Sequence, residues 1–164
     1  VQVNKNKIST SKVIDRIDKK ILRLLQSNGR VSNIELSKAI NLSPTPCLER
    51  VKRLERNGYI KGYTALLDPK ALGSELLVFV EITLTRTSSD IFNEFNQAVV
   101  QLAPVLECHL VSGNFDYLIK ARVANMEEYR LFLGETLLTL PGVADSRSYV
   151  VMEEVKETLS IPIT

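Results

Sequence analysis

The 164-residue chain contains no tryptophan, only two cysteines and a single histidine. Cys47 and Cys108 are too few and too far apart for a disulfide framework, and neither belongs to a Cys-x-x-Cys motif. We therefore expect both thiols to be reduced, as in a cytoplasmic protein. His109 has no cysteine or carboxylate pair at a metal-ligand spacing, so we expect a structural histidine and no metal.

Long hydrophobic runs and glycine-rich motifs are missing as well. The longest wholly apolar stretch is residues 76–80, far short of a membrane span, and the N-terminal residues lack the apolar core of a secretory signal. There is no phosphate-binding loop of the Walker type, no dinucleotide fingerprint and no nucleophile elbow. The sequence therefore predicts a cytoplasmic protein that is not an enzyme and carries no cofactor.

Charge is unevenly distributed along the chain, although the net charge is only +2. Residues 1–61 hold 14 Lys and Arg against 5 Asp and Glu, a net +9, and the remainder holds 7 against 14, a net −7. Such asymmetry indicates that the first part meets a polyanion and the second does not.

Residues 43–58, SPTPCLERVKRLERNG, are typical of a short basic helix. Ser43 is a suitable N-cap, Pro44 suits the first helical position, and Gly58 suits a left-handed C-terminal cap. One apolar stripe is expected at Leu48, Val51 and Leu54.

Two further helices are predicted before the basic one. Residues 32–40 begin with a Ser-x-x-Glu capping box, Ser32 and Glu35, and an earlier helix runs from residue 14 to the Asn28-Gly29 pair. Asn41 tolerates positive φ and can form the tight corner before the basic helix. Three short helices with this spacing predict a helix-turn-helix, whose third helix enters the DNA major groove.

The exposed side of the third helix supplies the candidate DNA contacts. The residues expected at base edges are Ser43, Thr45, Pro46, Glu49, Arg50 and Arg53. Arg50 or Arg53 is predicted to pair bidentately with guanine, whereas Glu49 either accepts from cytosine or orients a neighbouring arginine. Arg30, Lys38 and Lys52 are predicted to contact phosphates.

The chain divides into five predicted segments. They are an arm at 1–13, the helix-turn-helix domain at 14–61, a strand and linker at 62–76, a second domain at 77–156 and a tail at 157–164. Residues 59–67 are predicted to form a strand in which Gly62 marks a small wing or a hinge.

The second domain is predicted to have βαββαβ order. Strands are expected at 77–86, 105–112, 116–123 and 143–151, with one helix starting in 87–90 and another capped by Asn125. This order is ferredoxin-like, so the whole chain is α+β. The sheet face away from the helices is expected to be apolar and covered by a second copy, through Leu77, Phe79, Val111, Leu118, Tyr149 and Val151.

Together these segments resemble the Lrp/AsnC family of transcriptional regulators. The resemblance rests on LSPTPCLERVKRLE, GYTALL, LLVFVEITL, ECHLVSGNFDYL, LGETLL, LPGV and YVVMEEVK, in family order between residues 14 and 156. It implies a regulator with a winged helix-turn-helix domain, a ferredoxin-like effector domain and a nucleoid-associated location. It also implies dimers that assemble into octamers or other rings, with octamer against hexadecamer left open.

The resemblance also implies an effector pocket between dimers for leucine or a related amino acid. The matching positions are Leu110, Gly113, Asn114, Asp116, Met126, Tyr149, Val150 and Val151. Asp116 suits the ammonium, the Gly113 turn suits the carboxylate, and apolar residues suit the side chain. An alternative to these binding roles is that Asp116 is only a turn residue and that Leu110 and Met126 belong to the hydrophobic core. Asn114 stands where relatives often carry Asp.

A second function uses the same surfaces. An architectural, nucleoid-type protein would wrap DNA with weak sequence preference and without a metabolite, so both functions remain open at the level of sequence.

Overall fold

A computed structural model describes residues 13–85 and 88–164, so the predicted arm at 1–13 lies almost wholly outside the described residues. The described residues form two compact units, the first made of 13–66 with 157–164 and the second made of 67–85 with 88–156. The short 157–164 segment therefore belongs with the first unit, although it follows the second unit in sequence.

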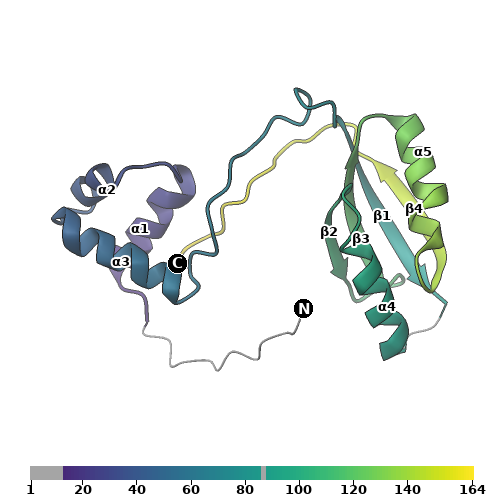
Figure 1. The fold of residues 1–164 in the computed structure, drawn as a ribbon, viewed down its shortest axis with the longest axis horizontal. Coiled ribbons are helices and arrows are strands. Elements are labelled where there is room, and N and C mark those ends of the chain that lie inside the picture. Colours follow the sequence, from purple (N-terminus) through teal and green to yellow (C-terminus); the bar gives the residue numbers. More distant parts are fainter. Residues whose placement is uncertain (1–12, 86–87) are drawn as a thin grey trace. The chain divides into compact units, whose positions relative to one another are not determined.

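Three helices form the first unit: α1 (Arg16–Ser27), α2 (Asn33–Ala39) and α3 (Pro44–Arg56) (Figure 1). The capping box predicted at Ser32 and Glu35 is confirmed, and α1 begins with a second box formed by Asp15 and Asp18. The tight corner before α3 is confirmed by Asn41, whose φ is 56°. Each boundary thus follows from a local side-chain bond or a backbone preference.

The core of this unit joins all three helices. It is built around Ile21, Leu36, Ile40, Cys47 and Leu54. The stripe predicted for α3 is wrong at one position, because Leu48 is 40% exposed whereas Cys47 is fully buried. Residues at i and i+7 lie on the same side of a helix, so Cys47 and Leu54 define the buried face.

The strand predicted at 59–67 is wrong, since the structure has no strand in that stretch. Tyr59 and Tyr63 of this stretch instead bond to α3, whereas residues 61–67 are all exposed. The Tyr59 N–H donates to the carbonyl of Leu54 at 3.0 Å, and the Tyr63 hydroxyl donates to Glu55 Oε1 at 2.9 Å. Within one copy this segment has no neighbouring strand edge to complete a ladder.

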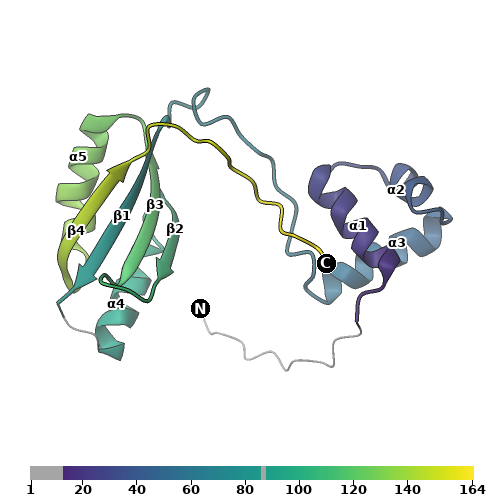
Figure 2. The same ribbon diagram turned by 180° about the vertical axis from the view of Figure 1, so that it is seen from behind.

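The second unit is a four-stranded antiparallel sheet with two helices (Figures 1 and 2). Its elements are β1 (Leu76–Leu84), α4 (Ser89–Val99), β2 (Val105–Leu110), β3 (Tyr117–Val123), α5 (Met126–Glu135), a 3₁₀ turn (Leu137–Thr139) and β4 (Val143–Val150). The strand order β2-β3-β1-β4 confirms the ferredoxin-like prediction.

The core of the second unit lies between the helices and one sheet face. Val78, Val80 and Ile82 of β1 are fully buried, with Phe95 of α4 and Phe132 of α5 packed against the same cluster. Alternate residues of β1 face the helices, as the period of two requires. The first predicted strand also included residue 86, which lies outside the described residues.

The opposite sheet face is only partly apolar, which corrects the sequence prediction. Phe79 and Leu118 lie on it, but Glu81 stands opposite Leu118 and Lys120 stands opposite Phe79. The Tyr149 hydroxyl donates to Glu81 at 3.0 Å. Charged and apolar side chains therefore share this face, because strand alternation constrains only the side toward the helices.

Candidate functional site

Helix α3 presents one exposed side. Thr45, Pro46, Glu49 and Lys52 are all exposed, and positions 45, 49 and 52 recur at helical spacing on one face. Pro44 occupies the first turn, and Ser43, although it stands at the N-cap, makes no side-chain capping bond. The structure thus brings together four of the residues predicted to contact DNA.

Arg50 and Arg53, the two arginines predicted at base edges, are paired with acidic residues at the start of α1. Arg50 Nη1 donates to Asp15 Oδ2 at 2.6 Å and to Asp18 Oδ1 at 2.9 Å. Arg53 Nη2 donates to Asp18 Oδ2 at 2.6 Å. Both carboxylate oxygens of Asp18 are therefore engaged by α3. Both side chains are thus paired within the unit, and their contacts with bases stay a prediction.

The Asp15–Asp18–Arg50–Arg53 group, hereafter the ion cluster, is anchored by a buried carboxylate. The side chain of Asp18 is only 2% exposed, against 24% for Arg50 and 41% for Arg53. The Asp18 backbone N–H and the Arg50 guanidinium lower the pKa of Asp15, and Asp15 and Asp18 in turn raise the pKa of Arg50. The ion cluster therefore joins the start of α1 to the middle of α3 by charge-assisted bonds.

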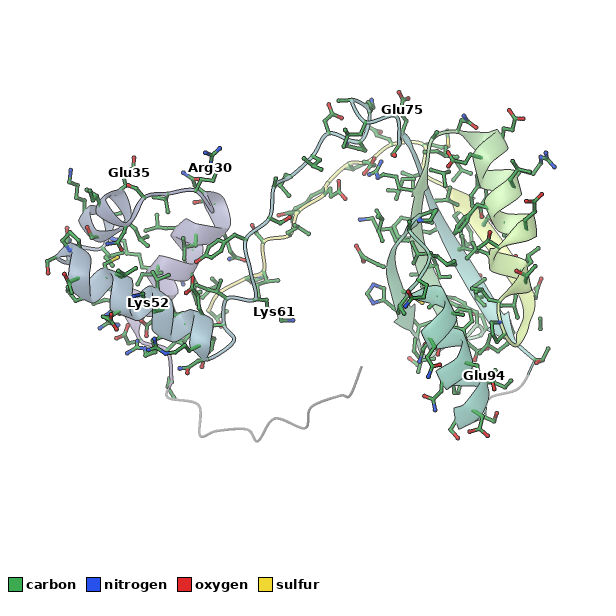
Figure 3. The ribbon with its side chains drawn as sticks, in the orientation of Figure 1. Arg30, Glu35, Lys52, Lys61, Glu75 and Glu94 are labelled. Carbon is green, nitrogen blue, oxygen red and sulfur yellow. The ribbon has the colours of Figure 1, made fainter. Side chains whose placement is uncertain are left out.

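The remaining predicted phosphate contacts are on the surface of the same unit. Arg30 and Lys38 are exposed, the first in the connection between α1 and α2 and the second in the last turn of α2. Figure 3 shows Arg30 extending from that connection and Lys52 lying on α3. Exposed cationic side chains at these places can contact a DNA phosphate backbone without any rearrangement of the unit.

The candidate effector residues separate into two groups within one copy. Asp116 lies level with the end of β1, because its N–H donates to the Ile82 carbonyl and its Oδ2 accepts from the Leu84 N–H at 2.7 Å. Leu110, Gly113 and Asn114 belong to the same end, since Leu110 pairs with Tyr117 at the start of β3.

The second group lies at the other end of the sheet. Val151 donates to the carbonyl of Leu77, Tyr149 pairs with Phe79, Val150 pairs with Val78, and Met126 starts α5 just after β3 ends. The levels of Asp116 and Val151 differ by about six residues of β1, or roughly 20 Å. One copy of the chain therefore does not bring the predicted effector residues into one pocket.

Several of these residues are open to solvent in the single chain. Leu110 is 61% exposed, Met126 is 55% exposed and Tyr149 is 45% exposed. Leu110 and Met126 are thus not core residues, which removes the alternative reading of those two positions. A glycine at position 113 leaves the turn open, since nothing lies within 4 Å of where a Cβ would be.

The chain matches two family models, the Lrp/AsnC ligand binding domain over residues 77–161 and a winged helix-turn-helix DNA-binding domain over residues 14–61. It is 65% identical over 147 residues, 90% of each chain, to the leucine-responsive regulatory proteins of Klebsiella pneumoniae and Escherichia coli K12. The chain belongs to the Lrp/AsnC family.

Two solved Lrp/AsnC-type structures extend the comparison to three dimensions. A Neisseria meningitidis transcriptional regulator in complex with L-Met has a TM-score of 0.88 and 39% identity, covering 92% of this chain and 97% of its own. An AsnC family regulator from Agrobacterium tumefaciens has a TM-score of 0.87 and 33% identity, covering 91% and 97%. As a member of the Lrp/AsnC family, the chain is a DNA-binding transcriptional regulator.

The ion cluster is the feature of this Lrp/AsnC chain that sequence reasoning missed. Two spacings could have indicated it: Asp15 and Asp18 three residues apart at a helix start, and Arg50 and Arg53 three residues apart on a helix. Each pair falls on one helix face. Their mutual contact depends on how α1 packs against α3, which neither spacing records.

The described residues contain no group of three or more His, Cys, Asp or Glu placed to hold a metal ion. Within the same part of the chain, no helix is both long and apolar enough to cross a bilayer. Both cysteines are free, and burial raises the pKa of the Cys108 thiol to about 11.

Proposed function

We propose that this regulator responds to leucine or a related apolar amino acid, bound between two copies of the chain. The observation that supports a shared site is the roughly 20 Å separation of the Asp116 group from the Val151 group along the sheet. A second copy is required if the two groups are to line one pocket. The leucine-responsive names of relatives, and the L-Met complex of the Neisseria regulator, support this class of ligand.

The chemistry of the two groups suits a free amino acid. Asp116 uses Oδ2 for the Leu84 N–H, which leaves Oδ1 for an ammonium group. The open turn at Gly113 and Asn114 offers backbone N–H groups to a carboxylate. Leu110 and Met126 are exposed apolar side chains that a ligand can cover, and doing so removes apolar surface from water.

Asp116→Asn tests the effector site directly. Asparagine keeps an oxygen for the Leu84 N–H but loses the charge, so leucine affinity should fall by roughly 10- to 100-fold, the range for a hydrogen bond to a charged group of ~1.5–3 kcal/mol. Titration calorimetry with leucine, methionine and alanine measures this. Asp145→Asn, an exposed change on β4, is the control. Unchanged affinity in Asp116→Asn would contradict the proposal.

On the DNA side, we assign base contacts to Thr45, Pro46 and Glu49, with Ser43 at the helix start. The ion cluster removes Arg50 from this set and occupies one nitrogen of Arg53. Arg50 faces Asp15 and Asp18, so Glu49 does not orient Arg50 toward a base. Arg30, Lys38 and Lys52 are assigned to phosphates.

The ion cluster also gives weight to the architectural alternative. If both arginines are held by Asp18, the exposed side of α3 keeps few side chains able to make bidentate base contacts. Competition between an operator and random duplex at physiological salt distinguishes the two. We expect a specificity ratio above 10³, and a ratio near one would indicate a wrapping protein instead.

The assembly we propose is a homodimer that associates further, to an octamer or a larger ring, in the cytoplasm and on the nucleoid. Its basis is the partly apolar open sheet face and the split effector site. The chain is proposed to have no enzymatic activity and no cofactor. Sedimentation at several protein concentrations, with and without leucine, tests the assembly, and a monomer at all concentrations would contradict it.

A further inference from the structure

The 157–164 segment is bound to α1 by side-chain contacts. The amide of Gln26 makes two hydrogen bonds with one residue: Nε2 donates to the Ile161 carbonyl at 3.1 Å, and Oε1 accepts from the Ile161 N–H at 2.8 Å. Arg23 Nη2 donates to the Ile163 carbonyl at 2.7 Å. Figure 2 shows this end of the chain at the three-helix unit.

These contacts use the side of α1 that the helical core leaves open. Arg23 and Gln26 are three residues apart and exposed, whereas Asp18 and Ile21 of the same helix are buried. Helix α1 therefore has two functional sides, one joined to α3 through the ion cluster and the other joined to the 157–164 segment.

The Gln26 side chain takes the place of a neighbouring β-strand in binding the segment. Its amide satisfies both the N–H and the carbonyl of Ile161, as a paired strand residue would. Pro162 lies between the two bound residues, fixes its own φ and has no N–H to satisfy. A pre-extended segment loses less conformational entropy on docking, and Ile163 becomes partly buried.

The chain that leads into the 157–164 segment starts at the candidate effector site. Val151 follows β4 directly and, with Tyr149 and Val150, belongs to the group proposed to line the amino-acid pocket. The chain between Val151 and Ile161 therefore has an effector-site residue at one end and an α1-bound residue at the other.

We propose that the outer side of α1, formed by Arg23 and Gln26, is the docking site of the chain's own 157–164 segment, and that this segment couples the effector site to the DNA-binding unit. The docking part stands on these contacts alone, whereas the coupling part rests on the proposed function. An occupied effector pocket repositions Tyr149–Val151 and changes the restraint that the segment places on α1.

Hydrogen exchange of the full-length protein tests the docking. The Ile161 amide, which donates to Gln26, should exchange at least tenfold faster in Gln26→Ala than in the unmodified protein. Gln97→Ala is the matched control, the same change at an exposed position of α4. Alanine favours helix, so α1 itself should stay folded. Equal exchange of Ile161 in the unmodified protein and Gln26→Ala would overturn the docking.

A photo-reactive phenylalanine derivative in place of Leu159 tests whether the segment belongs to the same chain. Cross-linking is carried out after labelled and unlabelled chains have been exchanged, and mass spectrometry identifies the α1 peptide that is captured. Capture within one isotopic form supports the assignment. Capture between labelled and unlabelled chains would overturn it in favour of a partner's α1.

DNA affinity measured with and without leucine tests the coupling. In Gln26→Ala the leucine-induced change in affinity should shrink at least threefold, while Gln97→Ala should respond like the unmodified protein. An unchanged response in Gln26→Ala, with Ile161 protection lost, would overturn the coupling. If the unmodified protein responds to no amino acid while Ile161 protection depends on Gln26, the proposed function fails and the docking stands.

Discussion

Asp18 is the residue on which the geometry of the DNA-binding unit most depends. Its carboxylate is buried, closes the α1 capping box through the Asp15 N–H, and accepts from both Arg50 and Arg53. A buried carboxylate is stable only when its oxygens are satisfied, and here all of its partners are positively charged or backbone N–H groups. When Asp18 is replaced, the Asp15 N–H, Arg50 and Arg53 each lose a hydrogen bond and must bond to water or stay unsatisfied.

Asp18→Ala should lower the free energy of unfolding of the first unit by about 1–3 kcal/mol. Removing one partner of a buried pair typically costs ~3–5 kcal/mol, but Arg50 and Arg53 remain 24% and 41% exposed and can regain water. Urea denaturation followed by circular dichroism measures the loss. Asp68→Asn, an exposed change in the linker, is the control, and equal midpoints for the two variants would contradict the role given to Asp18.

Asp15 makes the stability of this unit depend on pH. Its folded pKa is held below the ordinary 3.8, first by the Asp18 backbone N–H and then by Arg50. A lowered carboxyl pKa contributes stability that is present above the unfolded pKa and is lost as pH falls through the folded value. The difference in urea midpoint between the unmodified protein and Asp15→Asn should therefore shrink as pH is lowered from 7 to below 4. A difference that does not change with pH would contradict this assignment.

At the scale of elements, the turn between the 3₁₀ segment and β4 is the most constrained junction. Gly142 has a φ of +77°, and a Cβ placed there would lie 2.5 Å from Ile91 Cγ2 on α4. The turn thus combines a left-handed backbone with a close approach to a neighbouring helix, and only glycine satisfies both. The start of β4 is positioned by this junction.

Gly142→Ala should destabilise the second unit by about 2–5 kcal/mol. The left-handed backbone contributes ~1–2 kcal/mol and the contact with Ile91 contributes ~1–3 kcal/mol. Gly134→Ala is the matched control, because Gly134 lies in α5 with nothing within 4 Å of a built Cβ, and alanine should stabilise the helix by ~0.5–1 kcal/mol. Thermal unfolding measures the difference in midpoint temperature between the two variants. Similar midpoints would contradict the role given to Gly142.

At the scale of the whole molecule, the separation of charge matches the division into units. The basic residues 1–61 fall in the unit that holds the helix-turn-helix, and the acidic remainder falls almost entirely in the sheet unit. Binding to duplex is therefore expected to depend steeply on salt, whereas association through the sheet is not driven by attraction to a polyanion.

Lys52→Gln tests the position of the DNA on α3. If Lys52 contacts a phosphate, the slope of log K against log salt concentration should become shallower by ~0.9, with affinity reduced on operator and random duplex alike. Lys70→Gln removes the same charge from the linker and should leave the slope unchanged. Fluorescence anisotropy between 50 and 200 mM salt measures both, and identical slopes would place Lys52 away from the duplex.

Elements whose causes are local could be predicted from the sequence. Three such features depend on residues close together in the chain: the capping box of Ser32 and Glu35, the positive φ of Asn41, and the burial of alternate residues Val78, Val80 and Ile82. The ferredoxin-like order followed from these elements taken in sequence. Family membership, likewise, could be read from motifs in order.

Contacts between side chains of different elements could not be predicted in this way. Two of these contacts join residues at least 32 positions apart: Arg50 and Arg53 with Asp18, and Ile161 with Gln26. The separation of Asp116 from Val151 likewise depends on how distant strands are paired in the sheet. A helical period shows which residues share a face but not what that face will touch. Contacts at this range depend on packing angles and register, which no local pattern contains.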